Sequence, residues 1–106
     1  MPTIDCWIQM LRPDEQTKTH RHTGSVIYHI VEGSGWTVIN GKRFDWKTGD
    51  IFCLPPWAWH DHANASNRQR AIIFSFADTP VLKAFDLYRE EAYSENQGRQ
   101  HVEATF

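Results

Sequence analysis

Residues 20–35 read HRHTGSVIYHIVEGSG, in which His20 and His22 stand two positions apart, just ahead of a β-branched apolar run. Side chains two apart on a β-strand point to the same face, so both imidazoles leave one side of the strand. The same spacing recurs at His60 and His62. Two such pairs converge when their strands face each other inside a barrel, and imidazole is a favoured ligand of zinc, iron, copper and nickel. We interpret the pairs as a metal site rather than as surface histidines, because each lies beside apolar strand residues.

The rest of the chain is typical of a barrel built from short strands. Apolar runs alternate with turn signals, and Asn40-Gly41 is a strong hairpin signal because both residues tolerate positive φ angles. Many short strands without alternating helices predict an all-β fold, either a closed barrel or a jelly roll. The expected strands are residues 3–11, 19–22, 25–32, 35–39, 42–46, 51–54, 59–64 and 70–77.

One helix is expected after the last strand. Asp78 or Thr79 can cap it, Pro80 suits its first turn, and apolar residues then recur at helical spacing as far as about Glu91. We interpret this helix as a lid packed on the outside of the barrel. Residues 94–106 are polar with little periodicity. The sequence therefore predicts a single domain over residues 1–93, helix included, and a polar tail over residues 94–106.

Composition argues against several classes of function. The 106 residues fit one domain, and a formal net charge of −2 leaves no basic stripe for nucleic acid or for a lipid surface. No apolar stretch is long enough to span a membrane, and the N-terminus lacks the pattern of a secretory signal. Cys6 and Cys53 lie among apolar neighbours and are expected to be buried thiols in a reducing compartment. We therefore expect a cytoplasmic protein.

The histidines fall in two longer motifs, and these resemble the motifs of the cupin superfamily. The first family motif places a glutamate ligand and then a glycine after a His-x-His pair. Gly33 matches here, while the glutamate slot is occupied by Val26, or by Ile27 if the spacing is four residues. The second motif is matched at Gly49, Pro55, His60 and Asn64, with Trp57 in place of an internal glycine. The resemblance implies a cupin-type β-barrel (a double-stranded β-helix or jelly roll) with one C-terminal helix. It also implies one metal held by His20, His22 and His60.

The resemblance is closer to one branch of the superfamily. Loss of the glutamate ligand leaves a three-histidine site similar to that of gentisate 1,2-dioxygenases, and the segments 20–35, 44–64 and 87–93 also resemble that family. Its members carry two barrels in one chain, and this sequence looks like the C-terminal barrel standing alone. The resemblance implies iron(II) as cofactor, with zinc, nickel or manganese as alternatives in purified protein. It implies an oxidoreductase of aromatic catabolism that cleaves the ring of a small hydroxylated aromatic acid.

Several other residues are candidates for the substrate pocket. Tyr28 shares a strand face with Val26 and stands where catalytic barrels of the family commonly carry an arginine for the substrate carboxylate. His62 is a candidate catalytic acid or base, and equally a satisfied histidine inside the barrel. Asp61 is expected to face solvent, and Cys53 to be a small core residue. An apolar wall for an aromatic ring, or ordinary core packing, is expected of Trp36, Phe52, Trp57 and Trp59.

Two functions are compatible with these features. The first is an iron(II)-dependent, ring-cleaving dioxygenase-like protein, which the intact histidines favour. The second is a non-catalytic module that binds metal or ligand and serves through dimerisation, which the lack of an inward arginine favours. We expect a small aromatic acid as partner, and neither nucleic acid nor membrane. A homodimer through residues 3–11 is also expected, because a small barrel rich in aromatic residues tends to bury an outer sheet face.

Overall fold

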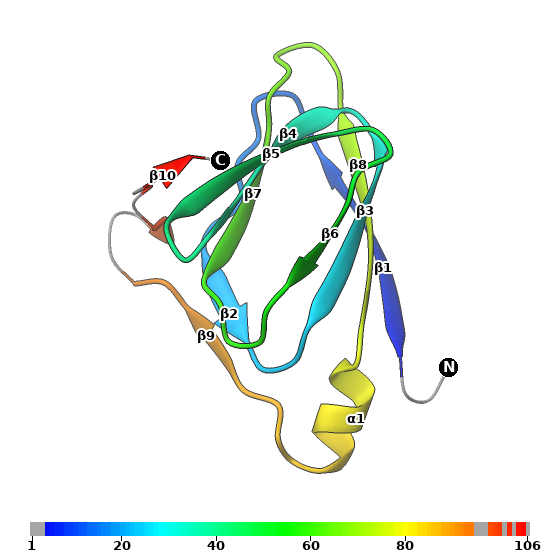
Figure 1. Ribbon diagram of the computed structural model, residues 1–106, viewed down its shortest axis with the longest axis vertical. Coiled ribbons are helices and arrows are strands. Elements are labelled where there is room, and N and C mark those ends of the chain that lie inside the picture. Colours follow the sequence, from blue (N-terminus) through cyan, green and yellow to red (C-terminus); the bar gives the residue numbers. More distant parts are fainter. Residues whose placement is uncertain (1–3, 95–97, 101, 103, 106) are drawn as a thin grey trace.

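The computed structural model describes residues 4–94, 98–100, 102 and 104–105. Within them the chain forms ten strands and one helix (Figure 1). Each strand expected from the sequence is present, with bounds that differ by at most two residues. The strands are β1 Asp5–Leu11, β2 His20–His22, β3 Val26–Glu32, β4 Ser34–Ile39, β5 Lys42–Lys47, β6 Ile51–Leu54, β7 His60–Asn64, β8 Ala71–Ala77, β9 Glu90–Ala92 and β10 Ala104–Thr105, and the helix is α1 Thr79–Ala84.

Two sheets face each other and enclose the core, which is the expected cupin-type β-barrel architecture. The first sheet has four strands in the order β1-β8-β3-β6, and the second has six in the order β10-β5-β4-β7-β2-β9. Neighbouring strands are antiparallel except for β10, which runs parallel to β5. Buried apolar side chains fill the space between the sheets, among them Leu11, Val26, Ile30, Leu54 and Ile73.

Alternation along the strands decides which side chains enter the barrel. In β3, Val26, Tyr28 and Ile30 are buried, while Ile27 and His29 are half-buried on the opposite face. The neighbouring strand β8 shows the same alternation, and the register pairs inward side chains with inward side chains. A strand with one face on the core requires this period of two. The alternation expected from the sequence, which puts His20 and His22 on one face and Val26 and Tyr28 on one face, is therefore the alternation that the strands have in the structure.

Two turns that the sequence singles out use left-handed backbone. Asn40 and Gly41 have φ angles of 47° and 81° and close the hairpin of β4 and β5, as the sequence predicts. Trp57, which replaces the glycine of the second motif, has a φ of 58°. The motif position therefore keeps a backbone conformation that suits glycine best. The Trp57 N–H donates to the His22 carbonyl at 2.9 Å, which ties this turn to β2.

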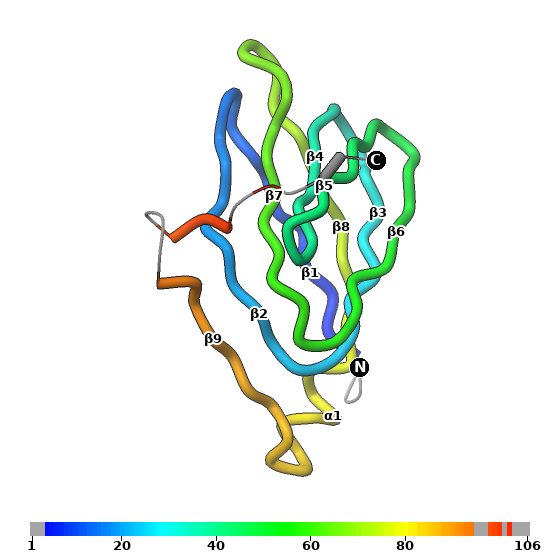
Figure 2. Tube along the Cα trace, turned by 60° about the vertical axis from the view of Figure 1, so that its left-hand side comes forward, coloured from blue at the N-terminus to red at the C-terminus, as the bar shows by residue number. Residues whose placement is uncertain are grey.

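The helix is shorter than predicted. α1 ends at Ala84, and Asp86 then takes a φ of 57°, which turns the chain away. Glu90–Ala92, expected as the helix end, instead form β9 and pair with β2. Figure 2 shows β9 running beside β2. The prediction fails because the free edge of β2 offers backbone hydrogen bonds that a strand can satisfy and a helix cannot. α1 is the single helix of the described residues, and its six residues are too few to cross a bilayer.

Part of the segment 94–106 packs against the second sheet. Gln100 is buried, and its Oε1 accepts the Gly41 N–H at 2.7 Å while its Nε2 donates to the Val38 carbonyl at 3.0 Å. β10 adds a strand to β5. Residues 95–97, 101, 103 and 106 lie outside the described residues. The domain boundary expected at residue 93 stays a prediction.

Two predictions about burial are wrong. Asp61 is buried rather than solvent-facing, because residues around Gln100 cover the outer side of β7; Asp61 Oδ2 accepts hydrogen bonds from Thr19 Oγ1 (2.6 Å) and Gln100 Nε2 (3.1 Å). Cys6 and Cys53, expected as buried thiols, are both exposed. Their strands alternate, and each cysteine falls on the side that faces away from the core.

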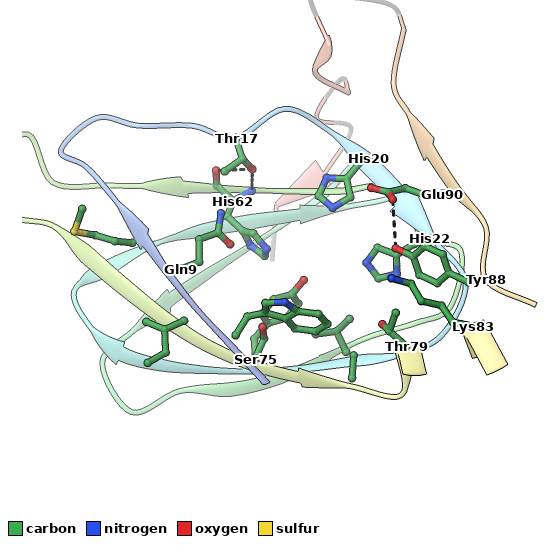
Figure 3. Close-up of a pocket in the computed structure, with 16 residues that line it drawn as sticks. Gln9, Thr17, His20, His22, His62, Ser75, Thr79, Lys83, Tyr88 and Glu90 are labelled. Carbon is green, nitrogen blue, oxygen red and sulfur yellow. Dashed lines mark hydrogen bonds between the residues drawn. The ribbon is translucent and has the colours of Figure 1, made fainter. Parts of the chain in front are cut away.

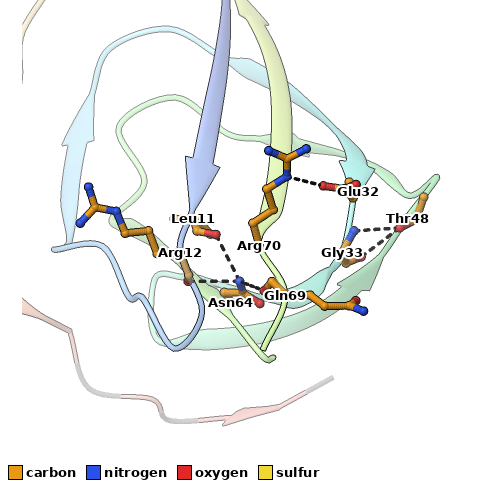
Figure 4. A network of polar contacts seen from close by, with 8 residues as sticks. All are labelled: Leu11, Arg12, Glu32, Gly33, Thr48, Asn64, Gln69 and Arg70. Carbon is orange, nitrogen blue, oxygen red and sulfur yellow. Dashed lines mark hydrogen bonds and ion pairs between the residues drawn. The ribbon is translucent and has the colours of Figure 1, made fainter. Parts of the chain in front are cut away.

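Asn64 closes the far end of the barrel (Figure 4). Its Nδ2 donates to three backbone carbonyls, those of Leu11 (3.2 Å), Arg12 (3.1 Å) and Gln69 (2.8 Å). Its Oδ1 accepts the Ser66 N–H at 2.9 Å. The amide thus joins the end of β1 to the loop between β7 and β8, and its combination of donors and acceptor accounts for an asparagine at this motif position.

Candidate metal centre

Three histidines converge where β2 and β7 meet. His20 and His22 leave the same face of β2, and His60 lies directly opposite His20 in the antiparallel register. One ring nitrogen from each of the three lies within 4.8 Å of the others. His60 is buried, and the two β2 histidines are half-buried. The structure therefore brings together the three residues that the sequence singles out as ligands.

Backbone carbonyls orient the three rings. The Nδ1 atoms lie 3.0 Å from the Ala58 carbonyl for His60, 3.2 Å from that of Thr23 for His22 and 3.5 Å from that of Lys18 for His20. A carbonyl only accepts, so each Nδ1 carries the hydrogen and each Nε2 keeps a free lone pair. Fixing one ring nitrogen in this way is how proteins prepare the other as a metal ligand.

Burial favours the neutral form of His60 and His20. Desolvation lowers the pKa of His60 to about 3, with the neighbouring His20 adding to the effect. Desolvation likewise lowers the pKa of His20, and the nearby His22 contributes in the same direction. Neutral imidazole is the form that binds a metal, so no proton has to be displaced at neutral pH.

His62 points into the barrel beside the cluster, but its partners differ from those of the three ligand candidates. Trp46 Nε1 donates to Thr37 Oγ1 at 2.9 Å, and Thr37 Oγ1 lies 2.7 Å from His62 Nδ1. The hydroxyl accepts the indole N–H through one lone pair, and its own hydrogen has His62 Nδ1 as its one hydrogen-bond acceptor among the described residues. Pairing that hydrogen places the hydrogen of His62 on Nε2. Burial lowers the pKa of His62 to about 3, with His20 as a second cause. His62 is therefore a neutral hydrogen-bond donor at this position.

A cavity of about 590 Å³ opens beside the cluster (Figure 3). It lies between the inner faces of the two sheets, with β1 on one side and the segment from α1 to β9 across its mouth. The pocket is lined by Trp7, Ile8, Gln9, Met10, Thr17, His20, His22, Val26, Tyr28, His62, Ser75, Ala77, Thr79, Lys83, Tyr88 and Glu90. Apolar ring surface and polar groups thus meet in one pocket, as in small-molecule sites generally.

The aromatic residues expected to form the pocket wall are dispersed. Tyr28 lines the cavity, and Phe52 stacks behind it with ring centroids 5.1 Å apart. Trp36 instead stacks on the guanidinium of Arg43, on the outer side of β4. Trp57 and Trp59 both lie 4.3 Å from the guanidinium carbon of Arg21, which also pairs with Glu91 at 2.8 Å. These three tryptophans are not among the lining residues of the described pocket.

Other lining residues were missed by sequence reasoning. Trp7 and Gln9 share the inward face of β1, and strand parity alone could have identified them. Lys83 and Tyr88 come from α1 and the turn after it, where no local pattern indicates a cavity; the Lys83 ammonium lies 5.2 Å from the Tyr88 ring centroid. The Tyr88 ring stacks near His22, with centroids 6.3 Å apart. Lys83 and Tyr88 reach the cavity because of contacts between segments that are distant in the sequence.

The fold and the placing of the histidines agree with a known family. The model of the cupin domain matches residues 7–76. This chain is a cupin. The match covers the strands from β1 to β8 and includes all three histidines of the cluster.

Among curated proteins this cupin is similar to 1,2-dioxygenases. It is 42% identical to 5-aminosalicylate 1,2-dioxygenase of Comamonas sp. over 106 residues, which are all of this chain and 28% of that protein. It is 38% identical over 90 residues to gentisate 1,2-dioxygenase 1 of Aquipseudomonas alcaligenes, covering 84% of this chain and 26% of the relative. The cupin therefore spans about a quarter of the length of these relatives.

A solved structure has a similar fold. The salicylate 1,2-dioxygenase of Pseudaminobacter salicylatoxidans superimposes with a TM-score of 0.80 at 30% identity, over 86% of this chain and 25% of that one. The same enzyme has also been solved with gentisate. The resemblance to gentisate and salicylate dioxygenases is thus present in both sequence and fold.

Proposed function

We propose that this cupin binds one divalent metal through His20, His22 and His60, and that with iron(II) it cleaves the ring of a small hydroxylated aromatic acid. The observation that carries the proposal is the convergence of three imidazoles at the wall of a cavity of about 590 Å³. The substrates named in the relatives, 5-aminosalicylate and gentisate, support the substrate class. The proposal extends that chemistry to a chain about a quarter of their length.

The donor set fits such a metal. Three imidazole nitrogens without thiolate or carboxylate suit iron, zinc, copper or nickel, and three ligands leave further positions for substrate and dioxygen. Val26 lines the cavity where the superfamily has a glutamate, so the protein contributes no negative charge from that position. Iron(II), when bound, supplies the redox chemistry that ring cleavage by dioxygen requires. Zinc, nickel or manganese are expected competitors in purified protein.

The cavity residues can orient an aromatic acid. The ammonium of Lys83 lies at the pocket mouth without an ion-pair partner among the described residues, and it can hold the carboxylate that an arginine holds in the family. The rings of Trp7 and Tyr28 offer apolar surface for the substrate ring. His62 presents its Nε2 hydrogen to the substrate hydroxyl. We therefore assign His62 the role of hydrogen-bond donor rather than base.

A second candidate function is the binding of an aromatic acid without turnover. The observation that favours it is the absence of an arginine from the described cavity lining, since a guanidinium binds a carboxylate through two charged hydrogen bonds and an ammonium does not. A cytoplasmic location and a homodimeric state complete the proposal.

The test combines metal content with oxygen uptake. Protein loaded anaerobically with iron(II) is mixed with gentisate, salicylate or 5-aminosalicylate under air, and oxygen consumption and ring-opened product are recorded. We expect slow, substrate-dependent uptake that is lost in His60→Ala and retained in His29→Ala, whose imidazole lies on the outer face of β3. Substrate binding without oxygen uptake, with iron confirmed in place, would favour the second candidate.

A further inference from the structure

The outer face of the four-stranded sheet is apolar from one edge to the other. Pairing registers align its side chains in rows that cross β1, β8, β3 and β6 on the side away from the core. The first row is Cys6, Phe76, Ile27 and Cys53, and the second is Ile8, Phe74, His29 and Ile51. Met10 and Ile72 begin a third row, which the register continues to Glu32 at the rim, and Val31 lies in the bulge of β3 beside it. We call the eleven side chains other than Glu32 the outer apolar face.

The outer apolar face is open in the single chain. Ile8 and Ile51, at opposite edges of the second row, are 74% and 67% exposed. Met10 is 50% exposed and Val31 47%. Phe74 and Phe76 lie half-buried at the centre, with ring centroids 6.3 Å apart. Contiguous apolar surface of this kind on a soluble chain marks an interaction site.

The distribution of charge indicates which partner fits. None of the eleven side chains is acidic, and none is lysine or arginine. Charge lies at the rim, where Arg70 pairs with Glu32 at 2.9 Å (Figure 4). An acidic or basic partner would find no opposite charge on this surface. A second copy meets no repulsion, because an apolar face is complementary to itself across a two-fold axis.

The size also suits a dimer. Four strands about 4.8 Å apart, with about six residues of 3.3 Å each, span a plan of about 19 Å by 20 Å. That plan is about 380 Å², roughly half of the 800 Å² per partner that a standard interface buries, so the face supplies the apolar centre of such an interface and the surrounding rim has to supply the rest. The apolar centre and charged rim match the usual anatomy of such interfaces.

We propose that the outer apolar face binds the same face of a second copy of this chain, so that the two four-stranded sheets pack face to face. Sheets packed in this way lie about 10 Å apart with interdigitating side chains. This proposal does not depend on the metal chemistry. A protein that binds no metal or shows no activity would not contradict it. It does support the pocket: β1 pairs only with β8 within the described chain, and its inward residues Trp7 and Gln9 alternate with Ile8 and Met10.

Sedimentation velocity across a concentration series tests the proposal. We expect the wild-type chain to be dimeric at micromolar concentration, and Val31→Lys and Ile51→Lys each to weaken the dimer at least tenfold. Both side chains are exposed in the single chain, so the substitutions should leave the fold and the metal content unchanged. Phe85→Lys is the matched control, because Phe85 is also exposed but lies after α1, away from this face. A monomeric wild type, or unchanged dimers in both variants, would overturn the proposal.

The native cysteines provide a test that needs no variant. Cys6 and Cys53 are the two cysteines of the chain, and they occupy opposite ends of the first row. Alkylation with iodoacetamide, read by mass spectrometry, should be fast in dilute protein and should slow for both thiols as the concentration rises through the dimer range. Equal labelling rates at all concentrations, in protein that sedimentation shows to be dimeric, would place the interface elsewhere and overturn the assignment.

Discussion

His60 is the best-buried member of the histidine cluster, and its Nδ1 is fixed by the Ala58 carbonyl. We predict that His60→Ala loses most of the metal from protein that otherwise carries close to one ion per chain, because two half-buried imidazoles on one strand cannot enclose an ion. Elemental analysis after gel filtration measures this. His29→Ala serves as control and should keep its metal; full occupancy in His60→Ala would refute the ligand assignment.

Thr37 links Trp46 to His62 and is fully buried. Thr37→Val keeps the shape of the side chain but leaves the indole N–H and the imidazole Nδ1 without partners, so we expect the free energy of unfolding to fall by about 1–3 kcal/mol. Urea denaturation measures this loss. Nitrogen NMR of His62 should also show its hydrogen no longer confined to Nε2. Thr37→Ser should restore both readouts, and a valine variant with wild-type stability and tautomer would contradict the hydrogen-bond chain.

Lys83 is the cation of the described cavity lining. Lys83→Met should weaken the binding of a hydroxybenzoate roughly 1.5-fold to fivefold, which is the range for a solvent-exposed charge pair. Metal content should not change. Titration calorimetry on metal-loaded protein gives the affinity, and Lys47→Met, which removes an exposed lysine from β5, is the control. Equal losses in the two variants would indicate a general charge effect rather than a contact with the carboxylate.

At the scale of elements, the short segment around Gln100 joins two strands of the second sheet through hydrogen bonds. Gln100 bonds β4 through the Val38 carbonyl and β7 through Asp61. Gln100→Ala leaves buried polar groups without partners, so we expect a loss of about 1–3 kcal/mol in the free energy of unfolding. Chemical denaturation provides the measurement. Arg68→Ala, in an exposed loop, should cost far less; equal costs would mean that the segment contributes no specific stability.

β2 is the element most dependent on the proposed metal. Its register with β7 consists of the single pair His20 and His60, while its other edge pairs with β9. A metal bound by histidines of both β2 and β7 would hold the two strands together. Removal of the metal with a chelator should therefore increase amide hydrogen exchange in β2 and β9, while β3 and β8 stay protected. Uniform exchange with and without metal would argue against a bridging ion.

The whole molecule should also respond to the metal. An ion that binds only the folded state stabilises it by mass action, by about 2.7 kcal/mol when its free concentration is one hundred times its dissociation constant. We expect the melting temperature to rise on metal addition and to fall again with chelator, and His60→Ala to show neither change. The proposed homodimer would add a concentration dependence to the melting temperature, so all melting curves are recorded at one fixed protein concentration.

Several features of this chain are local and could be predicted from sequence. Strand parity placed His20 with His22, and the Asn40-Gly41 pair predicted the hairpin of β4 and β5. Strand alternation predicts which face a side chain leaves, but it does not predict whether another segment covers that face, and the predicted exposure of Asp61 was wrong for this reason. Asp61 leaves the barrel as expected, yet it is buried under a segment almost forty residues further along the chain. The cysteines were expected to be buried from their apolar neighbours, but strand alternation places both on the outer face.

Sequence by itself determined the β-barrel and its histidine cluster, because a period of two and a turn signal are properties of neighbouring residues and hold wherever the strand lies. Tertiary structure alone decided that the predicted helix stops at Ala84, that Lys83 and Tyr88 reach the cavity, and that Trp57 and Trp59 stack on Arg21 instead. Each of these depends on contacts between segments far apart in the chain. Such contacts are settled by which edges and surfaces remain unsatisfied once the barrel has formed.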